Sequence, residues 1–164
     1  MCHYGDNLVG ILVMKHYKLG SIYNYEWNES NFSILKNIIK QVIFAIIYAY
    51  ETIGFIHGDL HSGNVLLKDS KKCYIEYEKH KLEVNKLEVI IMDFEKSKIS
   101  KELNIYDLIK NINKFITSII YSNNMKLHFE YIELINYNNL ILFNTEISYY
   151  DKIDIIIEKL TIKK

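Results

Sequence analysis

The stretch GFIHGDLHSGNVLL, residues 54–67, gathers four polar side chains immediately after a long apolar run. His57, Asp59, His61 and Asn64 lie within eight positions of one another. The cluster has two interpretations. Asp and Asn often satisfy turn amides, so these residues could form a structural loop that caps a helix. Alternatively, they form a catalytic loop, and the surrounding sequence has to distinguish the two.

The residues before this loop predict one long buried helix. From Ser30 or Asn31, both suitable N-caps, to Thr52, apolar residues recur at helical spacing, and Gly54 supplies the stop. The wide apolar stripe is typical of a central helix rather than a surface one. Further upstream, an apolar run that turns polar before Gly20 predicts a strand over residues 8–16.

Three short β-like runs follow the loop: NVLLK (64–68), CYIEYE (73–78) and LEVIIMDF (87–94). They predict small antiparallel pairs, with the charged stretch 79–86 between the last two. We expect the lysine-rich stretch 68–86 to be an exposed hairpin, with binding of an acidic partner as the alternative.

Helical spacing returns after Asp93 and predicts a helix over residues 105–120, with further helices near 126–137 and 148–160. No repeat or linker marks a domain boundary. We therefore predict a single domain, residues 1–164, of the α+β class, mainly helical with small antiparallel β-hairpins.

The composition excludes several function classes. Twenty lysines balance twenty acidic residues, so no broad field favours nucleic acid or an anionic membrane as partner. The sequence contains no arginine, so phosphate would have to be bound by metals, amides and lysines. Cys2 and Cys73 lie far apart and predict neither a zinc site nor a disulfide framework. Charged and polar residues interrupt the apolar runs before a membrane span of about 20 residues, and no targeting segment is evident. We expect an intracellular location.

Taken in order, the helix, the polar loop and the strand runs resemble the catalytic core of the protein-kinase-like superfamily. Its loop has the form H-x-D followed five residues later by Asn, which His57, Asp59 and Asn64 match. A second Asp follows at the end of an apolar strand, as Asp93 does in VIIMDFE.

Two groups within the superfamily resemble this chain further. HGDLHxxN, with Gly58 and His61 in place of the usual Arg and Lys, is similar to the loop of aminoglycoside phosphotransferases and related small-molecule kinases. The DLHxGN portion, the long interval of 29 positions between Asn64 and Asp93, and NIYDLIKN are similar to haspin-type and large-DNA-virus kinases. The resemblance covers most of residues 8–125.

The resemblance implies transfer of the γ-phosphate of ATP to a hydroxyl group. In that chemistry one carboxylate orients the acceptor hydroxyl and other oxygen ligands hold Mg²⁺ on the phosphates. Asp59 would take the first role, Asn64 and Asp93 would hold Mg²⁺, and His57 would support the loop. A protein Ser/Thr acceptor is our first choice and a small-molecule hydroxyl the second.

The resemblance also places residues 8–16 as a hinge strand that pairs with the adenine of ATP through its backbone. Met14 would lie at the gatekeeper position, and Lys15, His16 and Tyr17 would offer hinge amides and carbonyls. Few residues precede this strand, so the large lobe alone matches, from about residue 20 to 164. We expect the small lobe to come from a partner chain or from sequence upstream. The alternative is a catalytically inactive scaffold of the same fold.

Three further residues keep two interpretations each. His61 is interpreted as structural, although it could ligate a metal with His57. Glu95 is interpreted as solvated, with an extra metal carboxylate as the alternative. Asp107 either ties its helix back to the catalytic loop or lies exposed on the helix surface.

Overall fold

The structure is a computed structural model that describes residues 2–4, 7–9, 14–77, 80–100, 102 and 104–122. Within these residues, two α-helices combine with four antiparallel strand pairs, which confirms the predicted α+β class. The elements, in chain order, are β1 (Cys2–Tyr4), β2 (Asn7–Val9), η1 (Glu29–Asn31), α1 (Phe32–Ile53), β3 (Phe55–Ile56), η2 (Ser62–Asn64), β4 (Val65–Asp69), β5 (Tyr74–Tyr77), β6 (His80–Glu83), β7 (Leu87–Ile91), β8 (Lys98–Ile99) and α2 (Ile105–Ser122).

Helix α1 begins and ends close to the predicted residues. The short 3-10 turn η1 leads into it, and Asn28 and Asn31 close a capping box on that turn. The helix ends at Gly54, whose φ of 68° is the left-handed conformation that glycine adopts without strain. A Cβ at Gly54 would lie 1.9 Å from the carbonyl oxygen of Ser100, so the close approach of the two segments also requires glycine.

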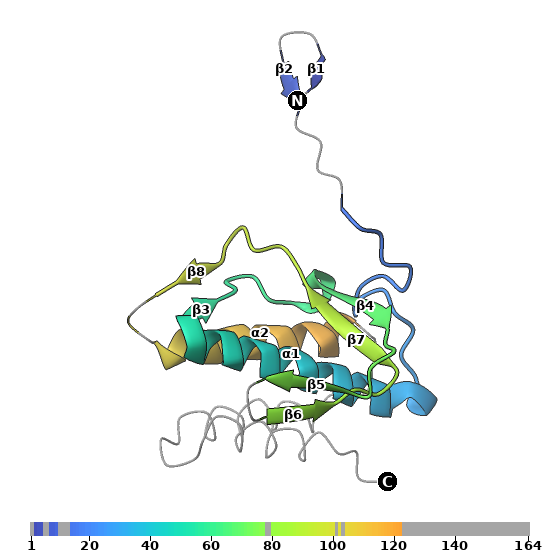
Figure 1. Cartoon of the computed structure of the whole chain (residues 1–164). Coiled ribbons are helices and arrows are strands. Elements are labelled where there is room, and N and C mark those ends of the chain that lie inside the picture. Colours follow the sequence, from blue (N-terminus) through green and yellow to red (C-terminus); the bar gives the residue numbers. More distant parts are fainter. Residues whose placement is uncertain are drawn as a thin grey trace.

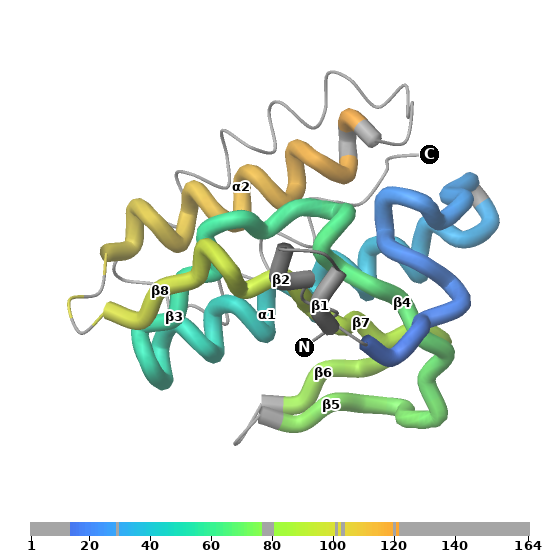
Figure 2. The backbone as a smooth tube through the Cα atoms, turned by 90° about the horizontal axis from the view of Figure 1, so that it is seen from above, coloured from blue at the N-terminus to red at the C-terminus, as the bar shows by residue number. Residues whose placement is uncertain are grey.

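Helix α1 is long and apolar enough to cross a membrane by length and composition, with a mean hydropathy of 1.5 over its best window. This is weak evidence, because the core helix of a soluble protein passes the same test. Half of the window is buried inside the fold. Figures 1 and 2 show α1 beside α2 and below β7, so its apolar surface has partners within this chain.

The central strand pair is β4–β7, which is antiparallel with Val65 opposite Ile91 and Asp69 opposite Leu87. Residues 20–22 line the other edge of β4. The Ile22 amide donates to the Val65 carbonyl (2.9 Å), and the Leu67 amide donates to the Gly20 carbonyl (2.9 Å). The predicted antiparallel pairs are therefore confirmed.

Strand β6 occupies part of the charged stretch 79–86, which we predicted to lie between two strands but within the hairpin of residues 68–86. It pairs with β5 as a hairpin. Leu82 and Val84 alternate with charged neighbours and are buried, so the stretch has a strand pattern that its charge concealed. The expectation of a hairpin within residues 68–86 is confirmed, although its apolar side is covered.

The predicted strand over residues 8–16 is wrong at residues 14–16, and residues 10–13 lie outside the described ones. Strand β2 covers residues 7–9, and residues 14–17 are irregular. Among the described residues, no strand pairs with residues 14–17, so their backbone groups lack the partner that a strand needs. Pairing with the body of the fold starts only at residue 20.

Helix α2 confirms the helix predicted over residues 105–120. Its apolar residues pack into the same core as α1; they are Leu108, Ile109, Ile112, Phe115, Ile116 and Ile119. The helices predicted near 126–137 and 148–160 lie outside the described residues.

Candidate functional site

The polar loop, residues 57–64, connects β3 to β4 and lies between α2 and the chain that leaves β7 (Figure 2). Leu60 anchors the loop in the core, because its side chain is completely buried. The polar groups of the loop form hydrogen bonds on two sides, to α2 and to the chain that leaves β7.

His57 joins the loop to the end of β7. Its side chain is fully buried, and its Nε2 lies 3.0 Å from the carbonyl oxygen of Met92. A carbonyl can only accept, so Nε2 carries the hydrogen and Nδ1 faces the amide of Asp59 at 3.4 Å. His57 thus connects the loop to the residue that follows β7, while its role in a catalytic loop stays a prediction.

Asn64 lies at the same end of β4 and is 8% exposed. The side-chain Nδ2 of Asn64 donates to the backbone carbonyl of Asp59 (3.0 Å), and the backbone carbonyl of Asn64 accepts the Met92 amide (3.0 Å). One short chain of hydrogen bonds therefore joins residues 57–59, Asn64 and Met92, the residue before Asp93.

Polar side chains on one face of α2 bond the loop on the side opposite the chain that leaves β7 (Figure 2). Asn111 Oδ1 accepts the Gly58 amide (2.9 Å), and Ser118 Oγ accepts the Ser62 amide (2.7 Å). Lys114 lies between them and pairs with Asp59. Spacings of three and four residues put these side chains on one helix face, so successive turns of α2 contact successive residues of the loop.

Asp59 is the one polar side chain of the loop that pairs with charged side chains. Its Oδ2 accepts from Lys96 Nζ (2.7 Å) and its Oδ1 accepts from Lys114 Nζ. The hydrogen bonds from Lys114 and Lys96 hold the pKa of the Asp59 carboxyl far below its usual value, against the opposing effect of partial burial. The bond to Asp59 is also the main reason that the pKa of Lys96 is raised.

Gly58 permits the contact between the loop and the turn that carries Lys96. Its φ is 79°, and a Cβ there would lie 2.1 Å from the Lys96 carbonyl oxygen. A side chain at this position would strain the backbone and displace the turn. The glycine that replaces Arg in the resembled loop is therefore a packing requirement of this fold.

Asp93 lies two residues beyond the end of β7, exposed, with a φ of 64°. A positive φ is uncommon outside glycine, and Asp tolerates it better than most residues. This conformation turns the chain immediately after Met92, which is bonded to His57 and Asn64. Asn64 and Asp93 thus lie at the same end of the β4–β7 pair.

The oxygen atoms available there fit Mg²⁺ in kind. Mg²⁺ prefers oxygen ligands and keeps several waters, so one or two protein ligands suffice. Asn64 uses its Nδ2 for Asp59, which leaves Oδ1 as a donor toward a metal, and Asp93 offers an exposed carboxylate. No group of three or more His, Cys, Asp and Glu side chains that could hold a metal occurs within the described part of the chain.

The residues with alternative interpretations are also placed. His61 is the N-cap of η2 and its Nδ1 accepts the Gly63 amide (3.1 Å), which is a structural role. Glu95 is exposed, as interpreted. Met14 is 52% exposed. The nucleotide-binding roles proposed for Met14, Lys15, His16 and Tyr17 stay predictions.

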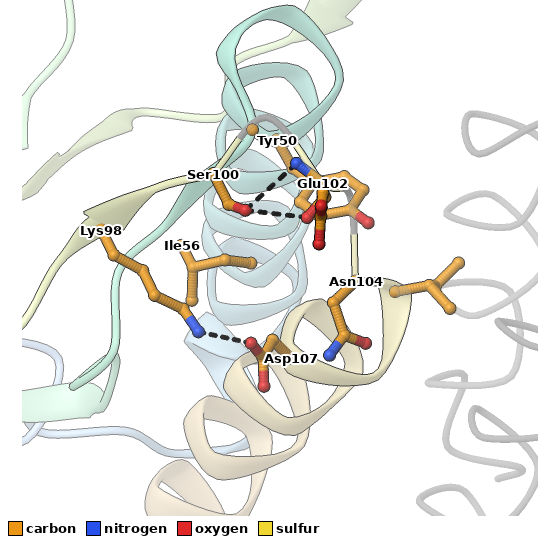
Figure 3. A pocket seen from close by; sticks show the side chains of 9 residues that line it. Tyr50, Ile56, Lys98, Ser100, Glu102, Asn104 and Asp107 are labelled. Atoms are coloured by element: carbon orange, nitrogen blue, oxygen red, sulfur yellow. Dashed lines mark hydrogen bonds and ion pairs between the residues drawn. The ribbon is translucent and has the colours of Figure 1, made fainter.

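A pocket of about 420 Å³ lies at the other end of the fold, where the C-terminus of α1 meets β8 and the start of α2 (Figure 3). Asp59, Asn64 and Asp93 do not line it. Asp107 is at its wall and pairs with Lys98 Nζ at 2.5 Å. Asn111 rather than Asp107 ties α2 to the polar loop, so neither interpretation of Asp107 describes it fully.

Sequence reasoning missed Lys96, Asn111, Lys114 and Ser118. The three residues of α2 gave only a weak signal: their spacing puts them on one helix face, but α2 has several other polar residues from which the sequence does not distinguish them. Lys96 gave none, since its meeting with Asp59 depends on how the chain turns at Asp93. A scan against protein-family models and a search of the curated proteins both found no match for this chain.

Proposed function

We propose that this chain carries the catalytic and metal-binding side of an ATP-dependent phosphotransferase of the protein-kinase-like type. The observation that supports it best is the hydrogen-bonded group of His57, Asp59, Asn64 and Met92, which joins the polar loop to the end of β7, two stretches separated in sequence. The group presents a carboxylate, an amide oxygen and the Asp93 carboxylate at one end of one strand pair. Phosphoryl transfer requires that combination.

In the proposed reaction, Asp59 orients the acceptor hydroxyl and accepts its proton while the γ-phosphate is transferred. Asn64 and Asp93 would hold Mg²⁺, which neutralises charge on the phosphates when it is bound. His57 keeps the loop in register with Met92. A small lobe from a partner chain, or from sequence upstream, would complete the wall around the nucleotide. A protein Ser/Thr acceptor is favoured over a small-molecule hydroxyl.

The ion pairs of Asp59 favour a second candidate, a binding module that keeps the fold without catalysis. Both carboxylate oxygens contact lysine ammonium groups, and a carboxylate so stabilised is a weak proton acceptor. This candidate differs from the first in one measurable respect, because it has no need for Mg²⁺-dependent nucleotide binding.

Calorimetric titration of the 164-residue chain with ATP, with and without Mg²⁺, tests the proposal. We expect micromolar binding that requires Mg²⁺ and that Asp93→Ala abolishes. Asp69→Ala is the matched control, since Asp69 is an exposed aspartate at the far end of the same strand pair. Loss of binding in Asp93→Ala but not in Asp69→Ala supports the enzyme. Absence of Mg²⁺-dependent binding in the unaltered chain overturns it and favours the binding module.

A further inference from the structure

The lysine pair on Asp59 has more positive charge than one carboxylate requires. Lys96 comes from the turn after Asp93 and Lys114 from the middle of α2, so two separate elements direct ammonium groups to the same point. Each ammonium group has three hydrogen-bond donors, and a bond to Asp59 uses one of them. Several donors therefore remain for a ligand with more oxygen atoms than a carboxylate.

The side chains of both lysines are accessible to solvent. Their side chains are 65% and 49% exposed, whereas that of Asp59 is 17% exposed and is held by the loop. Exposed ion pairs contribute little to stability, so the fold does not depend on keeping the two lysines on Asp59. A stronger anion nearby would therefore compete for them at small cost.

The chemistry of the chain limits what that anion is. A phosphate group offers several charged oxygens, and lysine is a recurrent phosphate ligand. The chain contains no arginine, so lysines are its only permanently charged cations. Asp59 lies beside the group that would hold the metal-bound phosphates, and Lys96 also feels the charges of Asp93 and Glu95.

We propose that Lys96 and Lys114 form a phosphate-binding pair for which Asp59 and the phosphate group of a ligand compete. When phosphate takes the lysines, the Asp59 carboxylate loses both ion pairs and becomes free to accept a hydrogen bond from a hydroxyl. Phosphate binding and activation of Asp59 are then one event. The first half of this inference concerns the lysines alone, and the second half rests on the proposed function.

Tripolyphosphate, titrated into the full chain in EDTA without Mg²⁺, is the probe. We expect Lys96→Gln and Lys114→Gln each to weaken its binding by about fivefold, the effect of one unit charge at contact distance in water. Asp59→Asn removes the competitor and should strengthen binding by about the same factor. This opposite sign distinguishes competition from a purely structural ion pair.

Lys110→Gln is the matched control, because Lys110 is an exposed lysine one turn earlier on α2. If it weakens binding as much as Lys114→Gln, the probe binds lysines without selection and the inference is wrong. The inference is equally wrong if Asp59→Asn leaves the affinity unchanged or lowers it. Should Asp59→Asn fail to fold by circular dichroism, Asp59→Ser carries the same expectation.

The two tests fail separately. The tripolyphosphate titration contains no metal and does not involve Asp93, whereas the ATP titration depends on Asp93 and Mg²⁺. If the lysine and Asp59 variants behave as expected but Asp93→Ala leaves Mg²⁺-dependent ATP binding unaltered, the lysine pair stands and the enzyme proposal fails. The reverse result leaves the enzyme proposal and removes the lysine pair.

Discussion

Both helices bond a neighbouring segment through a few polar side chains on one face, but the segments differ. In α1, Asn37 and Gln41 lie one turn apart on a mostly apolar helix and bond the backbone of residues 83–89. In α2, Asn111, Lys114 and Ser118 lie on one face and bond the loop of residues 57–64.

The difference lies in what the bonded partners do next. The partners of α1 are backbone groups at and before β7, and these bonds fix the strand pair against the core. The partners of α2 are the amides around Asp59 and the Asp59 carboxylate itself, so these bonds fix a candidate site. The comparison predicts that variants in α1 reduce the stability of the whole fold, whereas variants in α2 mainly affect the loop.

Gln41→Ala should have the largest effect. Gln41 is 2% exposed; its Nε2 donates to the Leu87 carbonyl (2.8 Å) and its Oε1 accepts the Val89 amide (3.2 Å). Truncation leaves both backbone groups without their partner, which should lower the free energy of unfolding by about 2–4 kcal/mol. Urea unfolding followed by circular dichroism measures it. Ser33→Ala, exposed on the same helix, should stay within about 0.5 kcal/mol. Equal losses in the two variants would contradict the role given to Gln41.

Asn111→Ala should have a smaller and more local effect. The variant loses the acceptor for the Gly58 amide (2.9 Å), at a cost of about 1–2 kcal/mol in unfolding free energy. Asn111→Asp keeps an acceptor at the same place and should recover most of the loss. Amide hydrogen exchange should rise in residues 57–64 well before it rises in β7. Uniform exchange across both regions would show that α2 supports the whole fold as α1 does.

The ion pairs of Asp59 predict the smallest effect, and it depends on pH. The folded-state pKa of Asp59 lies below the ordinary value of 3.8, so its contribution to stability is complete above that value and is lost as the pH falls through the folded pKa. Exposed pairs contribute about 1 kcal/mol or less. Between about pH 6 and about pH 3, the urea midpoint of the unaltered chain should therefore fall further than that of Asp59→Asn. Parallel curves would show that the pairs do not persist in solution.

The sequence predicted those parts of the fold that repeat a local pattern. Helices α1 and α2 and the β4–β7 pair follow from periodic apolar residues, and Gly54 marks a helix end by its own conformational freedom. Strand β6 was not predicted as a separate strand because Leu82, which it buries, lies between the charged residues Lys81 and Glu83. The strand predicted up to residue 16 was wrong at residues 14–16, because an apolar run says nothing about whether a neighbouring strand is present.

The candidate site was predictable to the extent that its residues share one motif. His57, Asp59 and Asn64 are at most seven residues apart, and the structure brings them together with Met92. The partners of Asp59 were not predictable, since Lys96 and Lys114 are 37 and 55 residues away and many lysines in the chain are equivalent by sequence. Asp107 was considered as the residue that ties α2 to the loop, whereas Asn111, one turn later, accepts the Gly58 amide.

The close approach at Gly58 links two features that look independent in the sequence: the absence of an arginine at position 58 and the presence of Lys96 in the turn after Asp93. A chain with an arginine at this position could not place the carbonyl of Lys96 where it lies here, because a Cβ alone would already overlap it at 2.1 Å. Restoring the arginine would therefore push away the turn that delivers one ammonium group to Asp59. An arginine at position 58 and the present position of Lys96 therefore exclude each other sterically. A chain with glycine at this position receives its positive charge beside Asp59 from the lysine of the turn.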